Sequence, residues 1–218
     1  MAVSRVYPDT IAAPVEHELV IKKSRFITHI SPVASPAEAD EFIAGIRTRF
    51  WDARHNCIAM VTGTLGDQAR SSDDGEPSGT AGMPMLDVLR RRTLTDLVAV
   101  VTRYFGGIKL GAGGLVRAYS TAVSETLDTA QLVHRRSLTA MRVEVSHADV
   151  GRYEHVLRDW AVHHDAVFGT TAYAARATVE VHTPPEAIAD LEAAVAALSQ
   201  GAASVIAGET NVVDVPAQ

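Results

Sequence analysis

The sequence predicts an α+β protein built from two α/β sandwich domains, and three observations support this fold class. Segments with strand patterns and segments with helix patterns alternate along the 218 residues, a length sufficient for two small domains. The composition shifts at residues 133–137, which read VHRRS. Beyond this point the predicted order of elements is β-α-β-β-α-β, which is the order of a ferredoxin-like sandwich. We therefore expect a first domain over residues 17–134 and a ferredoxin-like domain over residues 138–218.

The N-terminal segment, residues 1–16, contains Pro8 and Pro14 and has little periodicity, so we predict a loosely held arm. Two short strands follow, over residues 17–23 and 26–33. Lysines and an arginine lie between them.

The segment from Pro36 to Phe50 has the signals of a helix. Ser35 is a suitable N-cap, Pro36 stands at the first helical position, and arginines occupy the last turn. After it we predict a third strand over residues 56–65, a short helix over residues 83–92 and a fourth strand over residues 97–101.

Between the third strand and the short helix lies a polar, glycine-rich stretch of seventeen residues, 66–82, which we predict to be a functional loop. Its carboxylates, together with the histidine before the third strand, are residue types that bind divalent metals, but DDGEP is also typical of a turn. The spacing matches no EF-hand or zinc motif, so we assign no metal site and no catalytic residue. Possible contributors to a binding surface are His55, Asp74, Glu76, Ser78 and Thr80.

The stretch RYFGGIKLGAGGLVRAY, residues 103–119, is the strongest candidate for a binding site. It follows the short apolar strand and contains five glycines within nine residues, 106–114. A helix is predicted directly after these glycines, over residues 115–130. Glycines let backbone N–H groups approach a ligand, and the start of a helix carries partial positive charge.

This arrangement favours an anion or phosphate-backbone site formed by Arg103, Lys109, Gly111, Gly113, Gly114 and Arg117. The alternative is a tight turn whose glycines satisfy positive φ angles and whose cations are solvated. The loop matches neither a Walker A motif nor a dinucleotide-binding fingerprint.

The second domain is predicted from a simple succession of elements: a strand at 138–146, a helix at 149–160, an antiparallel pair at 166–171 and 173–182, a helix at 184–198 and a closing strand at 203–213. Thr183 is a candidate N-cap of the last helix.

Composition and charge limit the function classes. A net charge of −6 argues against tight, non-specific DNA binding. Residues 1–134 have a net charge of −1 and residues 135–218 have −5, so any phosphate contact must come from a local patch in the first part. A single cysteine fits a reducing cytosol, and no stretch is apolar enough to span a membrane, so we predict a cytoplasmic protein without a membrane contact.

Four segments in this order resemble the IMPACT/YigZ family: KKSRFITHISPV, ARHNCIAMV, DDGEPSGTAGMPML and RYFGGIKLGAGGLVRAY. The resemblance implies a first domain similar to the second domain of a small-subunit ribosomal protein. It also implies a second, ferredoxin-like domain similar to the C-terminal domain of elongation factor G. Eukaryotic members regulate translation by competing for the protein that activates a stress kinase, and bacterial members have no settled activity. The resemblance points to the groove between DDGEPSGTAG and RYFGGIKLGAGG as the functional surface.

The leading hypothesis is therefore a translation-associated regulator that binds the phosphate backbone of RNA or of the ribosome through the glycine-rich basic loop, without a cofactor. One alternative is an enzyme or binder of a phosphorylated small molecule, with Mg²⁺ held by Asp74 or Glu76. Another is a regulator that docks a protein partner in translation control on its acidic C-terminal domain.

Overall fold

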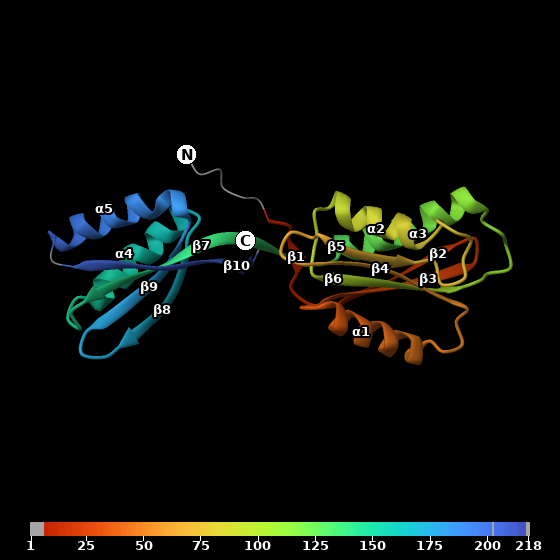
Figure 1. Cartoon of the computed structure of the whole chain (residues 1–218), viewed down its shortest axis with the longest axis horizontal. Coiled ribbons are helices and arrows are strands. Elements are labelled where there is room, and N and C mark those ends of the chain that lie inside the picture. The colour runs from red at the N-terminus through yellow and green to blue at the C-terminus, as the bar shows by residue number, and fades with distance from the viewer. Residues whose placement is uncertain (1–6, 202, 217–218) are drawn as a thin grey trace. The chain divides into compact units, whose positions relative to one another are not determined.

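The computed structural model describes residues 7–201 and 203–216, and it confirms a two-domain α+β fold. The chain divides into two compact units, Tyr7–His134 and Arg135–Val215, each with its own sheet (Figure 1). The strand β7 (Leu132–Val145) contains the boundary between them.

The unit Tyr7–His134 is built on a five-stranded antiparallel sheet in the order β2-β3-β6-β4-β5. Its strands are β2 (Val15–Ile21), β3 (Ser24–Pro32), β4 (His55–Thr62), β5 (Gln68–Ser72) and β6 (Leu97–Tyr104). The helices α2 (Gly82–Arg91) and α3 (Ala112–Asp128) cover one face, and α1 (Pro36–Arg49) covers the other (Figure 1).

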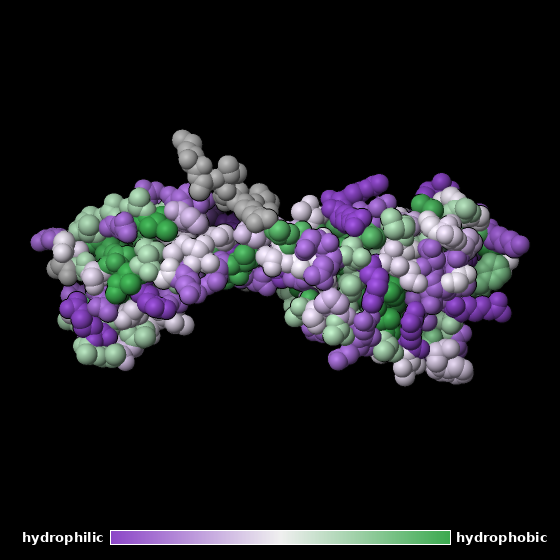
Figure 2. All heavy atoms as spheres, in the orientation of Figure 1, coloured by the Kyte–Doolittle hydropathy of each residue, from purple (hydrophilic) through white to green (hydrophobic). Residues whose placement is uncertain are grey.

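Both faces of this sheet are packed, which explains why the central strand β6 is buried along almost its whole length. Phe26, Leu97 and Tyr119 belong to the core beneath α2 and α3, whereas Ile43 and Val100 belong to the core beneath α1. In Figure 2 the visible surface of this unit is mostly hydrophilic, with small separate hydrophobic patches.

The predicted start of α1 is confirmed. Ser35 has extended backbone angles, and its Oγ accepts a hydrogen bond of 3.2 Å from the backbone N–H of Glu38. The Glu38 carboxylate in turn accepts a 2.7 Å bond from the N–H of Ala34, which is a capping-box arrangement shifted by one residue.

The stretch 66–82 was predicted as a loop without regular structure, and this is wrong for its first part. Residues Gln68–Ser72 form the edge strand β5, which pairs with β4 in the register Thr62↔Gln68 to Ile58↔Ser72. The strand is polar and largely exposed, so it lacks the apolar alternation from which strands are recognised.

The N-terminal segment is held more tightly than a loose arm. Thr10–Ile11 (β1) pairs with the start of β7, and the side chain of Ile11 is buried. The backbone of Asp9 donates to Thr93 and accepts from Thr95. Of the predicted arm, residues 1–6 lie outside the described part of the chain.

The second unit has the predicted β-α-β-β-α-β order, with the strands arranged β10-β7-β9-β8 as in a ferredoxin-like fold. Its elements after β7 are α4 (Val150–His163), β8 (Val167–Tyr173), β9 (Ala177–Thr183), the 3₁₀ turn η1 (Pro185–Ala187), α5 (Ile188–Ser199) and β10 (Ser204–Pro216). Thr183 does not cap the last helix, because Pro184 is extended and the α-helix begins only at Ile188. Among the described residues, no helix is long and apolar enough to cross a membrane.

Candidate functional site

A pocket of about 660 Å³ lies in the Tyr7–His134 unit, where β4 begins, β6 ends and α3 begins. Its walls carry basic, acidic and aromatic side chains together. The lining residues are Asp52, Arg54, His55, Glu76, Pro77, Arg103, Tyr104, Phe105, Lys109, Leu110, Gly111, Ala112 and Leu115.

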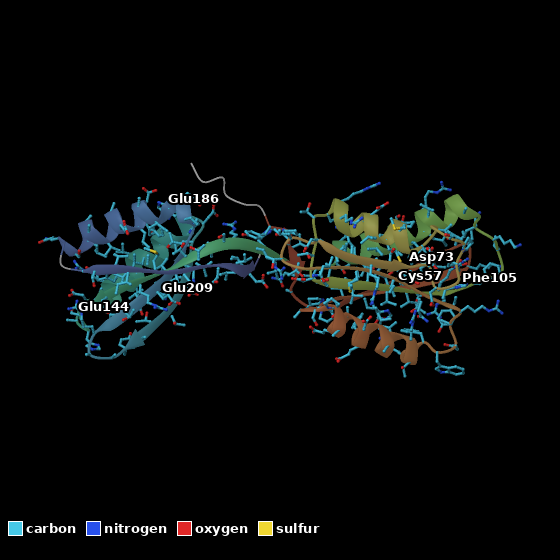
Figure 3. All side chains as sticks on the ribbon, in the orientation of Figure 1. Cys57, Asp73, Phe105, Glu144, Glu186 and Glu209 are labelled. Carbon is cyan, nitrogen blue, oxygen red and sulfur yellow. The ribbon has the colours of Figure 1, made fainter. Side chains whose placement is uncertain are left out.

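Strand register brings the two sides of the pocket together. β4 and β6 are antiparallel neighbours, and His55 pairs directly with Arg103 in their ladder. Phe105 follows the last residue of β6, at the end of the sheet where the glycine-rich loop begins (Figure 3). The buried strand β6 therefore places a charged residue, Arg103, in the pocket wall.

The N-terminus of α3 opens on this pocket without a side-chain cap. Gly111 has φ 71°, a left-handed conformation that glycine adopts without strain. The helix has no acidic residue in its first turn, and its first internal bond runs from the N–H of Leu115 to the carbonyl of Gly111. The N–H groups of Ala112, Gly113 and Gly114 precede that bond, so they provide donors of the kind that bind anions at helix starts.

The pocket floor contains a buried ion pair. Arg103 Nη1 donates to Glu76 Oε1 at 2.6 Å, and the two side chains are only 7% and 4% exposed. The hydroxyl of Tyr119 donates to the same carboxylate oxygen at 2.8 Å. Arg103 Nε is enclosed and has no hydrogen-bond partner among the described residues. Glu76 thus orients Arg103 and leaves part of its guanidinium unsatisfied.

Cys57 completes this buried cluster. Its Sγ lies 3.0 Å from the carbonyl oxygen of Asp73, its close neighbour in Figure 3, and 3.4 Å from the hydroxyl of Tyr119. Burial raises the pKa of the Cys57 thiol to about 12. Burial likewise raises the pKa of Tyr119, so both groups stay protonated, and neither is an activated nucleophile.

Asp73 organises the loop that carries Glu76. Its carboxylate accepts three backbone N–H bonds of 2.8–3.0 Å, from Gly79, Ala81 and Gly82. Burial alone would raise the pKa of Asp73, but the three donors outweigh it and hold this pKa below its ordinary value. The residue was not among the predicted contributors, although an Asp at the start of a turn is a recognisable signal.

Asp74 is structural. Its carboxylate accepts from the N–H of Asn56 at 2.7 Å and from Arg47 at 2.9 Å. Its carbonyl oxygen accepts a 2.9 Å hydrogen bond from His55 Nδ1. The other ring nitrogen of His55, Nε2, takes no part in this bond. Asp74 therefore positions His55 and does not line the pocket itself.

The structure brings three of the six predicted basic-loop residues to the pocket. Arg103, Lys109 and Gly111 line the pocket together with His55 and Glu76. Six other predicted residues lie outside the lining: Asp74, Ser78, Thr80, Gly113, Gly114 and Arg117. Thr80 donates to the carbonyl of Pro77, Ser78 is exposed, and Arg117 is exposed on α3. Gly113 and Gly114 lie in the first turn of α3.

Sequence reasoning missed several pocket residues. Arg54 lines the pocket, and so do Asp52 and Tyr104, which are joined by a hydrogen bond of 2.7 Å between the Tyr104 hydroxyl and Asp52 Oδ1. Asp52 and Arg54 lie between α1 and β4, Tyr104 ends β6, and only the folded sheet brings the two segments together.

A second basic feature adjoins the glycine-rich loop. Lys22 and Lys23 form the two-residue turn between β2 and β3, and a Cβ on Gly106 would collide with the backbone of Lys23. Both lysines have positive φ, 46° and 66°, where Asn and Gly are usually preferred. Both are exposed.

No group of three or more His, Cys, Asp and Glu side chains with the arrangement of a metal site occurs in residues 7–201 and 203–216. The carboxylates considered for Mg²⁺ have other partners: Glu76 binds Arg103 and Tyr119, and Asp74 binds Asn56 and Arg47.

The chain is similar to members of a known protein family. Residues 22–127 match the Impact N-terminal domain. The chain is 51% identical over 150 residues to IMPACT family member YvyE of Bacillus subtilis, covering 69% of each chain. It is 36% identical over 200 residues to IMPACT family member YigZ of Escherichia coli, covering 91% of this chain and 96% of that one. A solved structure described as a hypothetical protein has a TM-score of 0.59 and 35% identity, covering 94% of this chain and 98% of that one.

Proposed function

The chain belongs to the IMPACT family, and we propose that it binds the phosphate backbone of RNA through the pocket at the start of α3, as a contact with the translation machinery. The observation that carries the proposal is the convergence of an uncapped helix N-terminus with three basic side chains, Arg54, Arg103 and Lys109, around one pocket. Backbone N–H donors, a helix dipole and fixed cations are the recurring parts of phosphate sites.

The charge balance within the pocket favours an anion. Glu76 offsets Arg103, whereas neither Arg54 nor Lys109 has an ion-pair partner among the described residues. Asp52 is the remaining acidic residue of the lining, and Tyr104 donates to it. A local excess of positive charge therefore exists in a chain whose net charge is −6.

The lysine turn favours a polymer over a single phosphate. Lys22 and Lys23 extend the basic surface past the glycine-rich loop. Their left-handed backbone costs about 1–2 kcal/mol per residue relative to ordinary conformations. We infer that the lysines act here through their charge, since they are poor residues for the turn itself.

The direct experiment is fluorescence anisotropy with a labelled single-stranded RNA of about twelve nucleotides, at low and high salt. Lys109→Glu and Arg54→Glu should each weaken binding about tenfold or more, and the parent should lose affinity as salt rises. The matched control is Arg90→Glu, which reverses the charge of an exposed arginine on α2 outside the pocket. If Lys109→Glu and Arg54→Glu both bind as the parent and the control do, the site is wrong.

The lysine turn allows a test with effects of opposite sign. The double variant Lys22→Asn, Lys23→Gly supplies the residues that this turn prefers, so it should stabilise the fold by about 1–2 kcal/mol. The same variant should weaken RNA binding because two cations are lost. A purely structural role predicts higher stability with unchanged affinity.

One observation favours a second candidate function, the binding of a phosphorylated small molecule. The pocket volume of about 660 Å³ lies within the usual range of small-ligand sites. A ligand that binds only the folded state must raise the melting temperature. A shift with nucleotides or sugar phosphates that Mg²⁺ enhances, without RNA binding, would favour this candidate.

A further inference from the structure

Two large aromatic side chains are exposed beside the pocket. Trp51 is 82% exposed and stands next to Asp52, which lines the pocket. Phe105 is 54% exposed and is itself a lining residue. Tryptophan is highly buried in most proteins, so an indole that is this exposed is unusual.

Both aromatic residues belong to backbone segments that are joined to the pocket. Trp51 lies in a turn closed by a 3.0 Å bond from the N–H of Ala53 to the carbonyl of Phe50. The next residue, Asp52, is tied to the end of β6 by the hydroxyl of Tyr104. On the other side, the guanidinium carbon of Arg103 lies 5.7 Å from the ring centroid of Phe105.

We propose that the pocket selects single-stranded RNA, with unpaired bases stacked on Trp51 and Phe105 while a neighbouring phosphate binds Lys109, Arg54 and the start of α3. This inference rests on the proposed function and adds the class of RNA. A π-face next to a phosphate site matches single strands, because every unpaired base offers a face for stacking. In duplex RNA those faces are covered, and only the backbone remains for recognition.

The chain provides its own optical probe. It contains two tryptophans, and the other, Trp160, is 9% exposed and stacked on His164 in the second unit. Titration of the full chain with unlabelled single-stranded RNA should quench the fluorescence of Trp51. In Trp51→Phe the quench should disappear while binding, followed by anisotropy, is largely kept by the phenyl ring.

The affinity test uses truncations of each ring. Trp51→Ala and Phe105→Ala should each lower the affinity for single-stranded RNA about tenfold, and duplex RNA of the same sequence should bind more weakly than the single strand. The matched control is Tyr173→Ala, which removes an aromatic ring that is 63% exposed in the second unit. It should bind as the parent does, and thermal melting should show that all three variants fold.

The outcomes separate this inference from the function on which it rests. The single-strand proposal alone is overturned if Lys109→Glu weakens a salt-sensitive binding of RNA, the aromatic truncations leave it unchanged, and duplex and single strand bind equally. If the parent binds neither form of RNA at low salt, both proposals fail.

Discussion

The two units of this protein fill their interiors differently. The core of the Arg135–Val215 unit is apolar, with Met141, Leu157 and Leu191 at its centre. The buried polar side chains described in that unit are two threonines, Thr139 and Thr183. The Tyr7–His134 unit encloses an arginine, a glutamate, a histidine and an asparagine as well as several threonines.

The difference indicates what each interior is built to do. A buried ion pair rarely stabilises a fold more than apolar side chains of similar volume would. The Glu76–Arg103 pair lies at the floor of the pocket, where it holds a guanidinium in place. We infer that the first unit tolerates a polar interior for the sake of its binding site, whereas the second is organised for packing.

The largest effect is expected from breaking the ion pair. Glu76→Ala leaves the positive charge of Arg103 buried without a partner, so the free energy of unfolding should fall by about 3–5 kcal/mol. Glu76→Gln also removes the negative charge but keeps an oxygen that accepts from Arg103 and Tyr119, so it should cost less by the contribution of these hydrogen bonds. Urea unfolding of the two variants measures this difference. If Glu76→Ala is as stable as the parent, the interior of the first unit does not depend on the buried ion pair, and the comparison with the second unit fails.

A comparable substitution in the second unit should affect stability alone. Leu157 is fully buried, and Leu157→Ala should lower the free energy of unfolding by about 2–5 kcal/mol by creating a cavity. RNA affinity, measured at a temperature where the variant is folded, should not change, because the pocket belongs to the other unit.

The control is Leu157→Met, which roughly conserves volume and should cost less than about 1.5 kcal/mol. If Leu157→Ala loses more RNA affinity than its fraction of unfolded protein explains, the second unit also contributes to binding.

The first unit also shows which parts of the site could be predicted from the sequence. The helix start at Ser35 and the glycine-rich approach to α3 are local signals, written in neighbouring residues. The first lies where the sequence indicates, whereas α3 begins at Ala112, three residues before the predicted start. The edge strand β5 is recognisable only from its pairing with β4, because its residues are polar.

The pairing of Arg103 with Glu76 could not be predicted, since it joins residues 27 positions apart through the sheet register and a turn held by Asp73. Its position beside the glycines predicts Arg103 as a phosphate-binding cation, with a solvated cation as the alternative. The fold instead buries it, and Arg54 and Lys109 remain as the pocket cations without an ion-pair partner in residues 7–201 and 203–216.

Asp73→Asn is expected to have the smallest effect on stability. This variant tests the turn that carries Glu76. The amide keeps one acceptor for the backbone donors but turns an NH₂ group toward another, so the free energy of unfolding should fall by about 1–3 kcal/mol.

The pH dependence identifies the carboxylate as the cause. Because the pKa of Asp73 is lower in the folded protein than its ordinary value of about 3.9, its ionised form stabilises the fold. The difference in stability between the parent and Asp73→Asn should therefore be complete above about pH 5 and should shrink as the pH falls through the folded pKa. Urea unfolding at several pH values measures it. A difference that stays constant down to low pH would mean that the three N–H bonds depend on the shape of the side chain and not on its charge.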